Sequence, residues 1–148
     1  MYQAFYGLRE RPFALLPDPS FLFLSNGHST ALTLLRYSIT SRQGFTVISG
    51  EVGGGKTTLI NRLLDEMKTG VTVGLINFTT PSSGDMGEWI MMAYGLPYKG
   101  KGKVELYDDF VQFMIREYAA GRPVVLIVDE AQNLGIRGLE EIRMLSNV

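Results

Sequence analysis

The chain has 148 residues, of which 45% are apolar and 20% charged, so it can bury a core and is not a disordered tail. Its length suits one domain. The 14 basic and 15 acidic residues give a net charge of −1, which excludes a strongly basic nucleic-acid module but not a local basic patch. The absence of Cys excludes a disulfide framework, a thiolate metal site and a Cys nucleophile. We find no apolar run long enough to span a membrane and no secretory signal at the N-terminus.

The first half of the chain predicts an irregular N-terminal segment, then alternating helices and strands. Residues 1–24 are rich in aromatic residues and Pro, which disfavour a long helix. Helical spacing of apolar residues begins near Ser25 and ends at Gln43-Gly44. Residues 45–49 predict a short buried strand, and a glycine-rich loop separates it from a helix over 56–70. Residues 71–78 predict a second strand.

The second half of the chain continues the alternation. A helix is expected from residues 81–83 to about Gly95, and another carries apolar residues from Leu106 to Tyr118. Residues 124–128 are all apolar, which is typical of a strand buried on both faces of a parallel sheet. A last helix is expected over residues 137–145. Strands alternating with helices predict an α/β fold.

A glycine-rich motif lies between the first expected strand and the helix that follows it. Residues 50–57, Gly50-Glu-Val-Gly-Gly-Gly-Lys-Thr, fit the pattern G-x-x-x-x-G-K-[ST] at every fixed position. Gly53, Gly54 and Gly55 have no Cβ, so their backbone N–H groups can approach a phosphate chain closely. The start of the helix adds free N–H groups and the positive end of its dipole. The motif predicts a nucleotide phosphate site.

Three side chains after the glycines have expected roles in this site. We expect Lys56 to reach the β- and γ-phosphates and the Thr57 hydroxyl to ligate Mg²⁺. Thr58 is expected to donate to the α-phosphate. The chain contains no Asn-Lys-x-Asp segment for guanine, so ATP is the expected nucleotide.

An acidic pair follows the apolar strand at 124–128. Asp129 is expected at the carboxyl end of that strand, where ligands bind in open α/β sheets, and there it would hold Mg²⁺ through water. Glu130 is expected to orient and deprotonate the attacking water. The alternatives are a helix cap for Asp129 and an exposed loop acid for Glu130. The pair favours hydrolysis over phosphate transfer.

These motifs carry a resemblance to a known family. The run from Tyr2 to Phe13, the stretch 17–25, His28-x-x-Ala-Leu, the glycine motif and the runs 129–134 and 139–147 together resemble the ExeA-type secretion ATPases. This is the general secretion pathway protein A family, which has a sister group in exosortase-associated loci. The broader class is the AAA+ ATPases, which includes ATP-binding helpers of transposition. Gly54 departs from the family, where Thr or Ser is commoner.

The resemblance implies a three-layer α/β/α P-loop fold and Mg²⁺-dependent ATP hydrolysis that drives assembly of an envelope secretion complex. It also implies a homo-oligomer, secretion-system partners at the inner membrane and a location on its cytoplasmic face. Family members carry a membrane helix and a peptidoglycan-binding domain after the ATPase domain. By resemblance, the stretch from Leu8 to Phe13 and the helix beginning near His28 are candidates for the adenine pocket. The alternatives are core packing for the aromatic residues and a local hydrogen bond for His28.

The resemblance also sets the expected domain organisation. Residues 1–43 would pack on the nucleotide site, and residues 44–148 would form the N-terminal part of the P-loop core. The sensor strand, arginine finger and lid would lie beyond Val148, so we expect an incomplete sheet and weak hydrolysis. We expect the gap between the strands at 45–49 and 124–128 to be filled by a neighbouring chain, a swapped segment or a rearranged strand order.

Two alternative functions stay open. The first is a DNA-associated ATPase of the transposition-helper kind, supported only by the lysines of residues 99–103. A solvated basic loop is the commoner explanation of such lysines, and no nucleic-acid partner is expected. The second is a binding module in which nucleotide switches an interaction surface without turnover.

Overall fold

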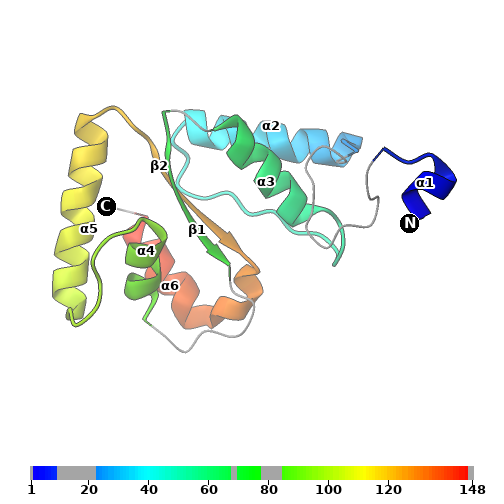
Figure 1. Ribbon diagram of the computed structural model, residues 1–148. Helices are drawn as coiled ribbons and strands as arrows, with labels where there is room; N and C mark the ends of the chain where they lie inside the picture. The colour runs from blue at the N-terminus through cyan, green and yellow to red at the C-terminus, as the bar shows by residue number, and fades with distance from the viewer. Residues whose placement is uncertain (1, 10–22, 68–69, 78–84, 147–148) are drawn as a thin grey trace.

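The computed structural model of the protein describes residues 2–9, 23–67, 70–77 and 85–146. Its elements in chain order are α1 (Tyr2–Tyr6), α2 (Asn26–Thr40), α3 (Lys56–Glu66), β1 (Thr72–Asn77), α4 (Met86–Ala93), α5 (Lys103–Ala119), β2 (Val124–Asp129), the 3₁₀ helix η2 (Ala131–Leu134) and α6 (Gly135–Leu145). Helices α2 and α3 lie together on one side of the two strands, and α4, α5 and α6 lie on the other (Figure 1). This layered α/β arrangement confirms the predicted fold class.

The sheet that the structure describes consists of β1 and β2, which run parallel. Their register pairs Thr72 with Val124 and Asn77 with Asp129, so the acidic end of β2 lies beside the end of β1. Residues 124–128 are half-buried. The expectation that this strand is buried on both faces is therefore wrong, because a two-stranded sheet leaves apolar side chains partly uncovered.

The larger core lies between the sheet and the helices α4, α5 and α6. Its buried apolar residues come from β1, α4, α5 and η2: Ile76, Met86, Ile90, Met91, Leu106, Phe110, Phe113 and Leu134. Tyr94 packs its ring against Phe110 and Phe113, with ring centroids 6.2 and 5.0 Å away. Gly74 makes room for that ring, since a Cβ on Gly74 would lie 2.8 Å from it. This core fixes β1 and β2 as the platform for the acidic pair.

A second core joins α2 to α3. Leu32, Leu59 and Leu63 are buried in it, and Ile48 packs against them. The predicted apolar faces are therefore confirmed within α2 and α3, which end at Thr40 and Glu66, earlier than the expected ends at residues 43 and 70. At the surface the same two helices are joined by an ion pair between Arg36 and Glu66, with nitrogen and oxygen 2.6 Å apart.

Residues 45–49 do not form the predicted strand. Among the described residues only β1 and β2 are strands, and residues 45–50 are left without regular structure between α2 and the glycine motif. Thr46 donates to Ser38 at 2.6 Å and Ile48 enters the second core, whereas Val47 is 85% exposed. A β-strand needs a ladder partner for its N–H and C=O groups, and this segment has none among the described strands. The prediction was wrong because an apolar, β-branched run indicates a preference for a strand but does not supply the neighbouring strand that must pair with it.

Several predicted boundaries shift. Helix α4 begins at Met86 with Asp85 as its N-cap, because the Asp85 carboxylate accepts from the Gly87 N–H at 2.9 Å. Its expected start at 81–83 lies outside the described residues, as does the aromatic and Pro-rich stretch 10–22. Helix α6 begins at Gly135, two residues before the expected start, and follows the unexpected η2.

Candidate nucleotide-binding site

The phosphate loop, residues 50–57, leads directly into α3. Gly53 and Gly55 have φ angles of +77° and +78°, in the left-handed region that favours glycine. Gly55 is the N-cap of α3 and provides no side-chain hydrogen bond, so the first N–H groups of the helix stay available for an anion. The loop is closed by a hydrogen bond from the Gly54 N–H to the Glu51 carbonyl, 3.1 Å long.

Lys56 folds back over the loop. Its Nζ donates to the carbonyls of Gly50 at 2.9 Å and Glu51 at 2.8 Å. An ammonium group has three donors, so one remains for a further acceptor, and the two carbonyls hold the charge beside the loop. Thr58 lies half-buried in the first turn of the same helix.

Thr57 and Asp129 meet although they are 72 residues apart in the sequence. The Thr57 hydroxyl donates to Asp129 Oδ2 at 2.9 Å, and Asp129 Oδ1 accepts from the Glu130 N–H at 3.0 Å. The Asp129 residue is 7% exposed. The structure thus brings together the two residues that the sequence analysis assigned to Mg²⁺. Their oxygens fit such an ion, because Mg²⁺ prefers hard oxygen ligands.

Glu130 lies just beyond the strand in an uncommon backbone conformation. Its φ and ψ are 55° and 40°, left-handed values that are rare for a residue with a side chain. The Glu130 side chain is exposed and accepts a hydrogen bond from the Gln132 amide. Backbone strain of this kind gathers at functional sites. Gln132 was not predicted as a site residue, because nothing in its sequence position indicates this contact.

A cavity of about 250 Å³ lies between the start of α2 and the phosphate loop. Its lining includes His28 and Ala31 from α2 and Ile48, Gly50 and Lys56 from the loop region. The expected adenine candidates near His28 therefore border the loop. Leu8 is described and 39% exposed, whereas the remainder of the expected stretch, from residue 10, lies outside the described residues.

A metal ion at this site would depend on ligands beyond the protein side chains. Within the ranges that the structure describes, no group of three or more His, Asp or Glu side chains could hold a metal ion. Thr57 and Asp129 supply oxygens from only two side chains, and Mg²⁺ is commonly bound by one or two carboxylates together with phosphates and waters. The donor set therefore fits a nucleotide-dependent ion better than a resident one.

The phosphate loop, the acidic strand end and the α/β layers define a P-loop nucleotide-binding protein. The AAA domain family matches residues 39–148. The match covers most of the chain, which therefore belongs to the AAA domain family.

A particular relative is similar along the whole chain. The general secretion pathway protein A of Aeromonas hydrophila is 37% identical over 149 aligned positions, which include all of this chain. The chain spans 27% of that relative's length. The resemblance to the ExeA-type family is thereby confirmed. No solved structure gives a significant match. In the described part of the chain, no helix is long and apolar enough to cross a membrane.

Proposed function

We propose that the chain binds ATP with Mg²⁺ and hydrolyses it. The observation that carries the proposal is the 2.9 Å hydrogen bond between Thr57 and Asp129, because it joins the phosphate loop to the acidic strand end. Two elements far apart in sequence then supply oxygens to one point beside the start of α3. A bound Mg²⁺ ion supplies positive charge that offsets the charge of the phosphate oxygens.

The residues around this point would divide phosphate binding, metal binding and proton transfer among them. Gly50, Gly53, Gly54 and Gly55 leave the loop backbone open to phosphate oxygens, and Lys56 adds a positive charge beside it. Thr57 and Asp129 would hold the metal, and Thr58 would donate to the α-phosphate. Glu130 follows Asp129 directly and would accept a proton from the attacking water once its side chain leaves Gln132.

The biological setting is proposed from the relative. We place the chain in a bacterial secretion or envelope-assembly system, because similarity to general secretion pathway protein A extends over all of it. In this setting the protein would act as a homo-oligomer on the cytoplasmic face of the inner membrane, with secretion-system proteins as partners. Pull-down with the tagged chain from a bacterial envelope fraction tests this placement, with Lys56→Ala as the control that should not bind nucleotide.

The experiment that tests the chemistry compares two variants of the full chain. Lys56→Ala should abolish ATP binding, because the loop loses its positive charge. Glu130→Gln should bind Mg²⁺-ATP and trap it unhydrolysed. Lys99→Ala is the matched control for loss of one positive charge outside the site. If the chain binds ATP without measurable turnover, the proposal of hydrolysis fails and the nucleotide-switched binding module takes its place.

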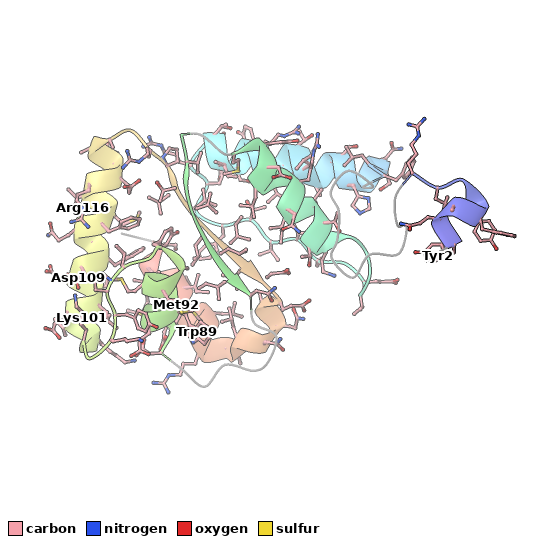
Figure 2. All side chains as sticks on the ribbon, viewed as in Figure 1. Tyr2, Trp89, Met92, Lys101, Asp109 and Arg116 are labelled. Carbon is pink, nitrogen blue, oxygen red and sulfur yellow. The ribbon has the colours of Figure 1, made fainter. Side chains whose placement is uncertain are left out.

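The transposition-helper alternative rests on Lys99, Lys101 and Lys103. Two of these lysines have acidic partners: Lys101 pairs with Asp109, and Lys103 lies 2.9 Å from Asp85. Figure 2 shows the side chains of Lys101 and Asp109 close together at the start of α5. Part of the positive charge is therefore neutralised locally. DNA binding at low salt that is lost on replacing all three lysines would favour this alternative.

A further inference from the structure

His28 connects the start of α2 to the phosphate loop. Its Nδ1 lies 2.8 Å from Ser25 Oγ, and its Nε2 lies 2.9 Å from the carbonyl oxygen of Gly54, 26 residues away. Ser25 Oγ also accepts from the His28 backbone N–H at 3.3 Å and is the N-cap of α2. The imidazole therefore bridges a capped helix end and the loop.

The partners of the two ring nitrogens define the protonation of the neutral imidazole. The Gly54 carbonyl can only accept, so Nε2 must carry the proton and donate it. Nδ1 is then the acceptor, and the Ser25 hydroxyl donates to it. The hydroxyl oxygen keeps a lone pair for the backbone N–H of His28. In these three hydrogen bonds, which link His28 to Ser25 twice and to Gly54 once, every donor therefore has an acceptor.

The bond to Gly54 determines which way one peptide of the loop faces. The Gly54–Gly55 peptide is trans, so its C=O and N–H point to opposite sides. Because the C=O faces His28, the Gly55 N–H faces away from α2. Gly55 is also the N-cap of α3, and a Cβ there would lie only 3.0 Å from His28 Nε2. The imidazole thus packs tightly on this peptide.

We propose that His28 is a positioning residue that fixes the Gly54–Gly55 peptide so that the Gly55 N–H is oriented for a nucleotide phosphate before the nucleotide binds. This inference rests on the proposed nucleotide binding. It differs from a direct nucleotide contact, in which the ring would meet the ligand itself. It also differs from a local helix cap, which would involve Ser25 alone.

Affinity measurements test the positioning role. Titration of the full chain with Mg²⁺-ATP should give an affinity for His28→Ala that is about two- to ten-fold weaker, the usual worth of one hydrogen bond. His28→Gln should recover most of the affinity, because its side-chain amide can donate to the Gly54 carbonyl. Thr33→Ala is the matched control, because Thr33 lies on the same helix and its hydroxyl donates to the Ser29 carbonyl. Unchanged affinity in His28→Ala would overturn the inference.

A spectroscopic measurement tests it without nucleotide. His28 is the one His of the chain, so ¹⁵N resonances of labelled imidazole belong to it alone. Recorded at about pH 8 or above, where an imidazole is neutral, the nucleotide-free protein should show the tautomer with the proton on Nε2, and Ser25→Ala should weaken that preference. A neutral ring with its proton on Nδ1, or rapid averaging of the two tautomers, would overturn the inference even if His28→Ala failed to fold. If the unaltered chain binds no ATP, the proposed function fails, whereas the tautomer still reports the bridge.

Discussion

At the residue scale, two left-handed glycines of the phosphate loop differ in what surrounds them. An alanine at Gly53 or Gly55 would cost about 1–2 kcal/mol of backbone strain. A Cβ at Gly53 meets no atom within 4 Å, whereas one at Gly55 approaches His28 Nε2 to 3.0 Å. We therefore expect Gly55→Ala to weaken ATP binding more than Gly53→Ala, measured by titration calorimetry. Equal losses would show that only backbone conformation matters at both positions.

The second prediction at this scale concerns Glu117, which is bonded to Arg122 and Thr72 near the amino ends of both strands. The two hydrogen bonds from Arg122 are 2.8 and 2.7 Å long. Arg122 first, and then the Thr72 hydroxyl, lower the pKa of Glu117 from 4.5 to about 2. A carboxylate with a lowered pKa stabilises the fold above its unfolded pKa, and that stability is lost as the pH falls from 4.5 toward 2.

This sign can be checked by denaturant unfolding at about pH 5 and about pH 3. Glu117→Gln should be less stable than the unaltered chain at the higher pH and should lose less stability between the two. Asp108→Asn, an exposed carboxylate on the same helix, is the control and should change neither value much. A pH dependence that survives unchanged in Glu117→Gln would contradict the assignment.

Only some features of the candidate site could be predicted from the sequence. Lys56, Thr57 and Asp129 could be predicted because their spacing and flanking elements define the motif. The contact of His28 with Gly54 could not, since local sequence does not encode which loop a helix end will meet 26 residues later. The left-handed backbone of Glu130 also escaped prediction, because an acid after a strand adopts many conformations.

At the element scale, β1 depends on Gly74, which has no side chain. Gly74 lets the Tyr94 ring lie against the strand, and a Cβ would approach three ring atoms at 2.8 to 3.1 Å. Tyr94 is wedged against Phe110 and Phe113, so it cannot simply withdraw. Gly74→Ala should destabilise the protein by about 1–3 kcal/mol in chemical unfolding, as overpacking does.

The control for this prediction is Gly44→Ala, where a Cβ meets no atom within 4 Å and φ is not in the left-handed region. That variant should have the stability of the unaltered chain or slightly more, because alanine restricts the unfolded state. Similar destabilisation of both variants would mean that lost flexibility, and not contact with Tyr94, decides the effect.

The start of α4 is stabilised by one carboxylate with two partners. Asp85 accepts from the Gly87 N–H at 2.9 Å and lies 2.9 Å from Lys103 Nζ at the start of α5. Lys103, and then the Gly87 N–H, lower the pKa of Asp85 against the opposing effect of burial. Loss of an N-cap costs about 0.5–2 kcal/mol, so Asp85→Ala should lower the melting temperature, whereas Asp85→Asn should keep most of the cap. Equal melting temperatures for the two variants would contradict the capping role.

At the scale of the whole molecule, the fold class could be predicted but the sheet could not. Alternation of apolar strands and amphipathic helices gave the layers, because periodicity follows from which face each element buries. Pairing is different, since it depends on which strands lie adjacent. Residues 45–49 read as a buried strand, yet Phe45 and Val47 are 54% and 85% exposed and no described strand pairs with the segment.

The unpaired segment yields the prediction with the widest reach. Without ladder hydrogen bonds, the amides of residues 45–49 should exchange with deuterium much faster than those of Thr72–Asn77 and Val124–Asp129. A longer protein that continues beyond Val148 should slow their exchange if it adds a strand between this segment and β2. If a neighbouring copy fills that place instead, exchange in the 148-residue chain should slow as its concentration rises. Slow exchange at every concentration in both proteins would show that residues 45–49 already have a partner within this chain. That result would contradict the inference that the sheet is incomplete.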